Sequence, residues 1–209
     1  MLKSNKEITR ESYQAIAQEF AQNVADLAPI KSIEKFMTLL GPKAKVIDIG
    51  SGSGRDAKIF TSKGIDVLGV DFSSNLIDIA KLNTPLANFQ LLDIETLNLP
   101  ASFFDGAWAA MSLAHIAKEN FPSVLNRIYC LLKKNGYFYL TLKKGSNEGL
   151  EKDLRYNDNV VKFWSYFSEE ELKNFLETAD FKILEFSLVK KNHSYQTHDA
   201  FRVFCQRVD

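Results

Sequence analysis

An acidic residue followed by three alternating glycines is the strongest chemical signal in the 209-residue sequence. Residues 48–54 read Asp-Ile-Gly-Ser-Gly-Ser-Gly and directly follow an apolar pair. Without side chains, the backbone at Gly50, Gly52 and Gly54 can turn sharply and approach a ligand closely. A helix that begins after this turn would present free amides that favour an anionic group. The pattern therefore predicts a ligand-binding turn between a strand and a helix.

Two more acidic residues, Asp71 and Asp93, end the next strand-like runs. Because parallel strands end at one edge of a sheet, both acids are expected beside the glycine turn. The Asp71 carboxylate is suited to accept from vicinal ribose hydroxyls, and Asp93 from an exocyclic amine. The turn and the acids predict a pocket for an adenosine with a small zwitterionic tail. Alternatively, Asp71 caps the next helix, although Ser73 and Ser74 fit that role, and Asp93 is a turn residue.

The glycine spacing separates two classes of nucleotide site. A dinucleotide-binding turn has glycine at its first, third and sixth positions. Here Gly50 and Gly52 occupy the first and third positions, but Arg55 occupies the sixth. A dinucleotide would then meet a bulky side chain at the closest helix–strand contact. A dinucleotide-dependent dehydrogenase is therefore the less favoured alternative.

Histidines are few in this sequence. His115 follows Met111 by four residues and is the histidine expected near the cleft. It is a candidate general base, and a structural or wall position is the alternative. His193 and His198 stand in a polar turn near the C-terminus and are expected on the surface.

The segment after the fifth expected strand is a candidate substrate wall. Arg155 is suited to bind a carboxylate or phosphate with two nitrogens. An ordinary surface ion pair of Arg155 with Glu151 or Asp158 is an equally open alternative. The aromatic run 163–167 is interpreted as packing rather than as a cage.

Apolar periodicity places these residues on alternating strands and helices. Residues 1–40 are expected to form helices that break at Pro29, and Gly41 ends the second one. The expected strands are 46–49, 66–71, 89–93, 105–111 and 137–142, and the expected helices are 56–63, 74–82, 121–133 and 168–178.

The C-terminal part differs from this alternation. The runs 181–189 and 200–208 are strand-like and are joined directly by a polar turn, which favours an antiparallel pair. We therefore expect an α/β fold in one domain, residues 1–209. Its sheet is doubly wound, mostly parallel and seven-stranded, with an antiparallel C-terminal hairpin strand and helices on both faces.

Composition restricts the possible functions. Lys plus Arg and Asp plus Glu both number 26, so the formal net charge is zero, which argues against a general nucleic-acid binder. Cys130 and Cys205 are too few for a disulfide scaffold and lack metal-ligand spacing, so no metal is expected. The N-terminus has no signal-peptide core and no apolar run is long enough for a bilayer, so a cytoplasmic protein is expected.

Four motifs in this order resemble those of the class I S-adenosylmethionine-dependent methyltransferases. They are the turn after 46–49, Val-Asp-Phe-Ser at 70–73, Leu-Asp at 92–93 and Phe-Asp-Gly at 104–106, and the match continues through Leu-Lys-Lys-Asn-Gly at 132–136. The resemblance covers about residues 44–144. It implies one Rossmann-like methyltransferase domain with a helical cap at 1–40 and a substrate-side insertion at 143–180.

The resemblance also implies roles for individual residues. Asp48 would orient the amino group of S-adenosylmethionine, and Asp71 would hold its ribose. The remaining cofactor-binding residues would be Gly50, Ser51, Gly52 and Arg55 along the turn, Phe72, Asp93 and Ile94 around the adenine, and Met111 at the sulfonium. The substrate-binding residues would be Tyr13, His115, Lys143, Arg155 and Tyr156, with Tyr13 as a lid residue or, alternatively, a core residue.

The implied activity is methyl transfer to a small molecule by in-line displacement. Family members that methylate nucleobase nitrogens often carry Asn/Asp-Pro-Pro-Tyr/Phe after strand four, whereas this chain has Met-Ser-Leu-Ala at 111–114. We therefore expect a small-molecule substrate, no nucleic acid and no membrane, in a monomer or homodimer. The alternative is a non-catalytic S-adenosylmethionine-binding module that acts through a protein partner.

Overall fold

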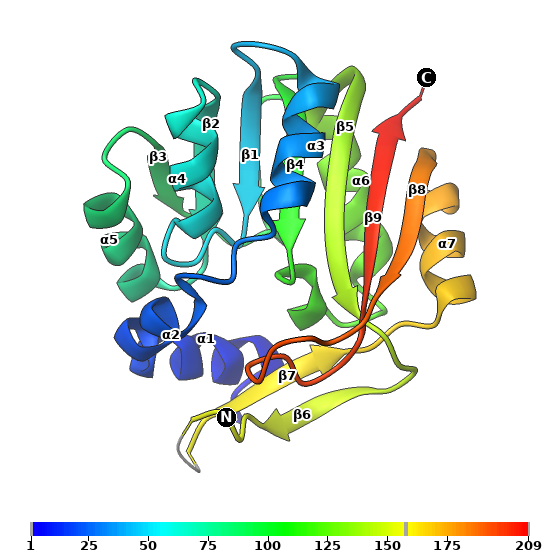
Figure 1. Cartoon of the computed structure of the whole chain (residues 1–209). Helices are drawn as coiled ribbons and strands as arrows, with labels where there is room; N and C mark the ends of the chain where they lie inside the picture. The colour runs from blue at the N-terminus through cyan, green and yellow to red at the C-terminus, as the bar shows by residue number, and fades with distance from the viewer. Residues whose placement is uncertain (1, 157–158, 209) are drawn as a thin grey trace.

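The computed structural model, which describes residues 2–156 and 159–208, is built around one large sheet (Figure 1). Within this part of the chain the sheet has seven strands, in the order β3-β2-β1-β4-β5-β9-β8. The strands are β1 (Lys45–Ile49), β2 (Asp66–Asp71), β3 (Asn88–Leu91), β4 (Phe104–Ala110), β5 (Leu132–Lys143), β8 (Phe181–Val189) and β9 (Ala200–Arg207). Strands β1 to β5 are parallel, and β9 is antiparallel to both β5 and β8. The predicted fold class is confirmed.

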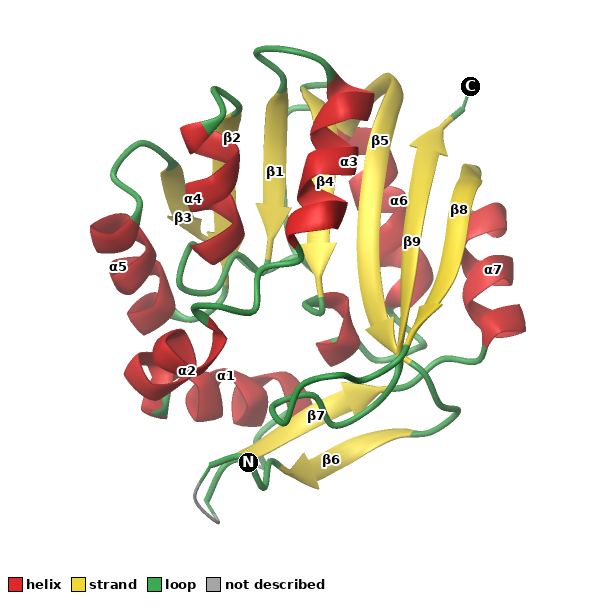
Figure 2. Ribbon diagram, in the orientation of Figure 1, coloured by secondary structure: helices red, strands yellow, loops and turns green. Residues whose placement is uncertain are grey.

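Helices cover both faces of the large sheet, as Figure 2 shows. One face carries α3 (Ile30–Leu40), α4 (Arg55–Ser62) and α5 (Ser74–Asn83), and the other carries α6 (Phe121–Leu131) and α7 (Glu169–Thr178). Along β1, Val46 packs in the apolar core on the side of α3, α4 and α5. Ile47 and Ile49 pack in the core on the side of α6 and α7. Burial on both faces explains why this strand is almost continuously apolar, with Asp48 as the exception.

A second layer lies beyond the carboxyl ends of the parallel strands (Figure 1). It consists of α1 (Asn5–Ala15), α2 (Ala17–Val24) and the hairpin of β6 (Glu148–Lys152) and β7 (Val161–Ser165). Three hydrogen bonds join α1 to β7: Ser12 Oγ donates to the Val161 carbonyl at 2.6 Å and accepts from the Val161 amide at 3.2 Å, and the Phe163 amide donates to Thr9 Oγ1 at 2.9 Å. The space between this layer and the sheet contains the site.

The structure corrects several sequence-based boundaries. The helix expected before Pro29 divides into two helices at Ile16, and β5 begins at Leu132, where the sequence predicted helix up to residue 133. The β6–β7 hairpin was not predicted. Lys162 lies within β7 and is fully buried. The apolar pattern that predicts a buried strand is therefore interrupted by a charged residue.

Two further searches cover the described residues only. No helix among them is long and apolar enough to cross a membrane. None of their His, Cys, Asp and Glu side chains form a group of three that could hold a metal ion. Cys130 is exposed, Cys205 is buried, and both are free thiols.

Candidate active site

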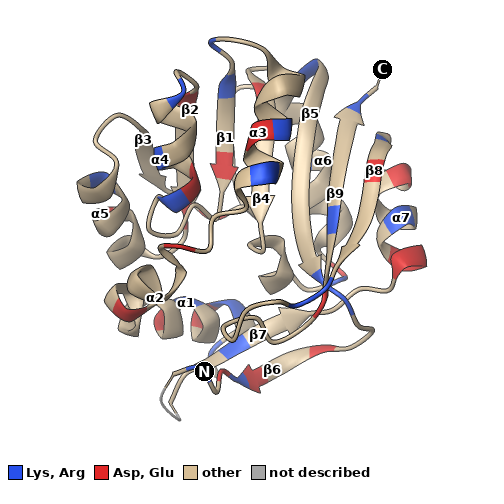
Figure 3. Ribbon diagram, in the orientation of Figure 1, with Lys and Arg blue, Asp and Glu red and all other residues tan. Residues whose placement is uncertain are grey.

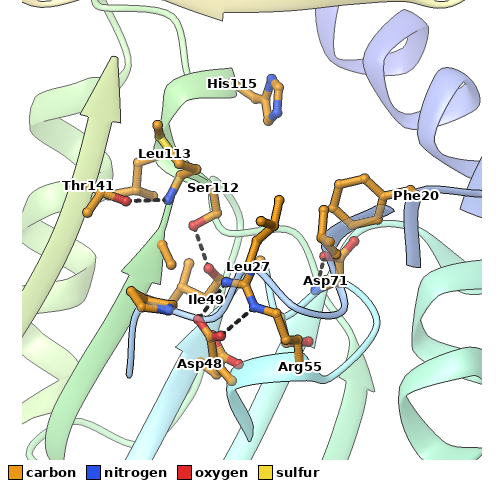
Figure 4. Close-up of a pocket in the computed structure, with 18 of the residues that line it drawn as sticks. Phe20, Leu27, Asp48, Ile49, Arg55, Asp71, Ser112, Leu113, His115 and Thr141 are labelled. Atoms are coloured by element: carbon orange, nitrogen blue, oxygen red, sulfur yellow. Dashed lines mark hydrogen bonds and ion pairs between the residues drawn. The ribbon is translucent and has the colours of Figure 1, made fainter. Parts of the chain in front are cut away.

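A cavity of about 550 Å³ lies between the carboxyl ends of the parallel strands and the second layer. Its volume is in the range of small-molecule sites. Figure 4 shows Asp48, Asp71 and His115 around the same space. Of the site residues predicted from the sequence, those that line the cavity are Tyr13, Asp48, Gly50, Ser51, Gly52, Arg55, Asp71, Phe72, Asp93, Ile94, Met111, His115, Lys143 and Arg155. Tyr156 does not line it.

The turn after β1 depends on its glycines. Gly50 and Gly52 have φ angles of 69° and 53°, and a Cβ on Gly50 would lie 2.2 Å from Cβ of Ser112. The amides of Gly50 and Ser51 both donate to the Val70 carbonyl, at 2.8 and 3.0 Å. These two amides therefore fix the turn against β2, and the turn offers a ligand a surface without bulky side chains.

Two buried oxygens in this region have no hydrogen-bond partner among the described residues: Oδ2 of Asp48 and Oγ of Ser51. Burial, reinforced by the charges of Asp56 and Asp71 and opposed by that of Arg55, raises the pKa of Asp48 well above its ordinary value. An unsatisfied buried oxygen costs free energy unless a donor reaches it. Both oxygens are therefore suited to accept from a ligand's ammonium group.

Arg55 does not donate a hydrogen bond to Oδ2 of Asp48. Its Nε lies 2.6 Å from Oδ1 of Asp56 at the start of α4, and its second terminal nitrogen lies 3.0 Å from Oδ2. The Trp108 indole donates to the same carboxylate at 2.8 Å. The Asp56 carboxylate thus holds the guanidinium, and Oδ2 of Asp48 stays free for a ligand.

Asp71 ends β2 and is almost fully buried. Its Oδ2 accepts from the Gly52 amide and its Oδ1 from the Ser73 amide, both at 2.9 Å. Burial raises the pKa of Asp71 to about 6, and these two amides oppose the rise. The cap of α5 is Ser73, whose hydroxyl accepts from the Leu76 amide. Asp71 is thereby available to a ligand, since each of its oxygens keeps a lone pair.

Asp93 is a turn residue whose side chain also lines the cavity. Its Oδ1 accepts from the Glu95 amide at 2.9 Å, which makes it a turn residue. Its Oδ2 lies 2.6 Å from the ammonium of Lys6 on α1, and the side chain still lines the cavity. A ligand amine at Asp93 would therefore share the carboxylate with Lys6.

Met111 stands directly after β4 with a φ of 65°, which is unusual for a residue with a side chain. Its amide donates to the Thr141 side chain at 3.0 Å and lies 3.2 Å from the Thr141 carbonyl. These contacts to β5 hold the conformation. Strained backbone of this kind is often found at functional sites.

His115 ends a short helix, η1 (Leu113–His115), and both of its ring nitrogens are engaged. Nδ1 lies 2.7 Å from the Phe163 carbonyl, and Nε2 lies 2.8 Å from the Tyr13 hydroxyl. Because a carbonyl only accepts, Nδ1 carries the proton and Nε2 accepts from Tyr13. Burial, and then the charges of three nearby cations, lower the pKa of His115 to about 3 despite the bond to Phe163. The imidazole is therefore neutral and has no free lone pair for a substrate proton.

Arg155, which is half-buried, forms an ion pair with the buried Asp153. Two of its nitrogens lie 2.7 Å from the two carboxylate oxygens, and Lys162 reaches the same carboxylate at 2.8 Å. The predicted surface pair with Glu151 is not formed, and Asp158 lies outside the described residues. Asp153, which the sequence analysis did not single out, therefore binds two cations. They lie at the end of the cavity lined by Lys143, Arg155 and Trp164, called the acceptor end below.

The β8–β9 connection supplies residues that the sequence analysis missed. Tyr195 lines the cavity, its carbonyl accepts from Arg155 at 3.2 Å, and its hydroxyl bonds to that of Tyr156 at 2.5 Å. Tyr156 thus stands behind Tyr195. His198 is exposed, as the sequence predicts, and also lines the cavity; its ring centroid lies 4.8 Å from that of Tyr166. The only signal for this segment was its polar composition, which is typical of a solvated turn.

Comparisons with known sequences show the family of this chain. A family model described as a methyltransferase domain matches residues 13–185. The malonyl-[acyl-carrier protein] O-methyltransferase of Salmonella typhimurium is 25% identical over 84% of this chain and 70% of that protein. The ubiquinone biosynthesis O-methyltransferase of Coxiella burnetii is 32% identical over 55% of this chain, and the match spans only 50% of that protein.

Solved structures show the same fold. The 1,6-didemethyltoxoflavin-N1-methyltransferase of Burkholderia thailandensis, solved with 1,6-didemethyltoxoflavin and S-adenosylhomocysteine, superposes with a TM-score of 0.78 at 22% identity, over 100% of this chain and 92% of that one. An S-adenosylmethionine-dependent methyltransferase of Methanosarcina mazei superposes with a TM-score of 0.75 at 22% identity, over 88% and 99%. The family model covers most of the sequence, and the chain therefore belongs to the class I S-adenosylmethionine-dependent methyltransferases.

Proposed function

We propose that the protein transfers the methyl group of S-adenosylmethionine to a small-molecule acceptor that binds in the same cavity. One observation carries the proposal: the cavity that contains Asp48 and Asp71 continues to Lys143, Arg155 and Trp164 beneath the second layer. Donor and acceptor can therefore meet within one continuous cavity of small-molecule size.

The cofactor end fits the amino-acid part of S-adenosylmethionine. Oδ2 of Asp48 and Oγ of Ser51 are buried and without protein partners, so they would accept from its ammonium group. That contact would give the buried Asp48 carboxylate a counter-charge, which favours its ionised form. The bare surface of Gly50 and Gly52 would let the ligand lie against the backbone.

The nucleoside part would lie beside the ends of β2 and β3. Asp71 would accept from the ribose hydroxyls with the lone pairs that its backbone bonds leave free. Phe72 and Ile94 line this part of the cavity and would pack beside the adenine. Asp93, shared with Lys6, would accept from the adenine amine.

Bound S-adenosylmethionine supplies an activated methyl group on a sulfonium, which is already a good leaving group. The protein then mainly has to align the acceptor, and such positioning contributes about 7–11 kcal/mol to catalysis. The neutral His115 holds Tyr13 in place, and the Tyr13 oxygen keeps lone pairs that can orient an acceptor O–H or N–H. On this account His115 is a positioning residue rather than a general base.

Some of the relatives support a small-molecule acceptor, whereas the Salmonella relative is named for malonyl-[acyl-carrier protein]. Two of them are named for ubiquinone biosynthesis and for 1,6-didemethyltoxoflavin, both small molecules. The balanced charge of the chain also gives no general attraction to a polyanion.

Radiolabelled methyl transfer tests the proposal. The protein is incubated with methyl-labelled S-adenosylmethionine and a cell extract divided into small-molecule and macromolecular fractions. We expect protein-dependent label in the small-molecule fraction. Label confined to macromolecules would contradict a small-molecule acceptor. Cofactor binding without any transfer would support the non-catalytic module instead.

A further inference from the structure

Lys143 has an unusual position at the carboxyl end of β5. The residue is only 6% exposed, yet it lines the acceptor end of the cavity. Its ammonium lies 3.2 Å from the ring centroid of Trp164 and 5.5 Å from that of Tyr166. Among the described residues, no carboxylate or carbonyl accepts a hydrogen bond from this ammonium. A buried cation is thus held by aromatic faces alone.

The neighbouring cations differ because they have a carboxylate partner. Arg155 and Lys162 both bind Asp153, and Arg155 also donates to the Tyr195 carbonyl. Glu151, the other nearby acid, accepts from the Tyr166 hydroxyl at 2.7 Å and has no ion pair with Lys143. Two of the three cations therefore share the Asp153 carboxylate, and Lys143 has no carboxylate in an ion pair. Figure 3 shows the basic positions at the end of β5 and on β7.

A buried charge without a partner is costly, and a protein avoids it by losing the proton or by binding a counter-ion. Burial, and then the charge of Arg155, lower the pKa of Lys143 to about 7, although Asp153 and Glu151 oppose the change. Near neutral pH the ammonium is therefore poised to take a counter-ion from the cavity.

We propose that Lys143 is the anchor for an oxyanion of the acceptor, a carboxylate or a phosphate on a flat apolar body. This proposal rests on the proposed function, because it places the acceptor in the same cavity. The apolar body would contact Trp164 and Tyr195, which line this end, beside the Lys143 and Arg155 groups that lie over their rings. The oxyanion-binding role expected of Arg155 moves to Lys143, because Asp153 already holds the guanidinium.

Binding of an oxyanion would raise the pKa of Lys143, so the complex takes up a proton. The charged and titratable groups around this ammonium include Arg155, Lys162, Asp153, Glu151, His115, His198 and Tyr166. Burial also lowers the pKa of Lys162 to about 8 and raises that of Asp71, in the same cavity, to about 6, so both titrate near this range. A variant without Lys143 separates its titration from theirs.

Calorimetric titration with benzoate and with its neutral counterpart benzamide tests the proposal. It is performed at pH 6 on the protein saturated with S-adenosylhomocysteine and repeated on the unliganded protein. We expect benzoate to bind about tenfold more tightly than benzamide, a ratio reasonable for one charge-assisted contact. Above pH 7 the affinity for benzoate should fall with pH, by up to about tenfold per unit.

The variants assign the effect to one side chain. Lys143→Met should abolish the preference for benzoate and its pH dependence, and Lys143→Arg should keep the preference. Lys152→Met, an exposed control on β6, should behave like the wild type. Phenyl phosphate in place of benzoate identifies the oxyanion, because the tighter ligand shows whether a phosphate or a carboxylate is favoured.

Three results would overturn the proposal: equal affinity for benzoate and benzamide, a preference that survives Lys143→Met, or no binding of either ligand. Failure of the proposed function has a different signature. In that case the wild type would not bind S-adenosylhomocysteine at all, whereas the titration of the unliganded protein would still report on Lys143.

Discussion

The hydroxyl of Tyr13 lies 2.8 Å from Nε2 of His115 and joins α1 directly to η1 at the end of β4. The two residues are 102 positions apart in the sequence. This bond, together with the contacts of α1 to β7, holds the N-terminal helix beneath the carboxyl ends of the sheet. The N-terminal segment thereby becomes a wall of the cavity rather than a separate extension.

Removal of the Tyr13 hydroxyl should destabilise the protein. Tyr13→Phe leaves Nε2 of His115 without its donor, and we expect the free energy of unfolding to fall by about 1–3 kcal/mol. Urea denaturation measures the change. Tyr137→Phe is the matched control, because the Tyr137 hydroxyl makes no hydrogen bond among the described residues. Equal effects of the two substitutions would show that the Tyr13–His115 bond contributes nothing.

His115 should affect stability in acid but not the neutral pH profile of activity. Its pKa is about 3 in the folded protein, below the ordinary 6.5, so the unfolded chain binds the extra proton first. The stabilisation from neutral His115 is therefore complete above pH 6.5 and is lost as the pH falls toward 3. Relative to His115→Gln, the wild type should lose up to about 1.4 kcal/mol per pH unit between pH 6 and 4.

Urea unfolding at pH 7, 6 and 5 compares the two proteins. A constant difference between them would mean that His115 titrates normally in the folded state. A step in the pH profile of kcat near 6.5 that disappears in His115→Gln would restore the general-base role for this residue.

The cofactor end was predictable because its signals are local. The glycine turn needs positive φ angles at Gly50 and Gly52, which glycine tolerates best. Asp71 interrupts an apolar pattern at the point where a parallel strand ends. Each feature is decided by a few adjacent residues, so the alternation of strands and helices was enough to bring them together.

The acceptor end was less predictable because its contacts join distant segments. The buried Lys162 ammonium bonds to Asp153 and lies over the ring of Tyr13. No short sequence pattern reveals these contacts. Tyr195 and His198 reach the cavity only because the β8–β9 connection folds back beneath the sheet. Polar side chains that satisfy one another in this way look like ordinary surface residues in a sequence.

Replacement of Asp48 should stabilise the unliganded protein and weaken its binding of the cofactor. Burial raises the pKa of Asp48, so its contribution to stability is greatest below the ordinary value of 3.8 and is lost as the pH rises. Asp48→Asn removes this penalty, and we expect the unliganded protein to gain about 0.5–2 kcal/mol at pH 7. Its affinity for S-adenosylhomocysteine should fall. Thermal unfolding with and without ligand measures both effects.

Asp78→Asn, on the exposed side of α5, is the control for Asp48→Asn and should change neither property. A less stable Asp48→Asn protein would contradict the view that this carboxylate is held for a ligand at the expense of stability. Unchanged affinity would remove Asp48 from the cofactor site.

The most direct test of the account is calorimetry with S-adenosylhomocysteine on the wild type, on Asp71→Ala and on Asp66→Ala, the exposed control at the other end of β2. The account predicts saturable binding by the wild type and by Asp66→Ala. Asp71→Ala should bind more weakly by about 1.5–3 kcal/mol, the range for hydrogen bonds to a charged acceptor. Equal affinity of Asp71→Ala and the wild type, or no binding by the wild type, would contradict it.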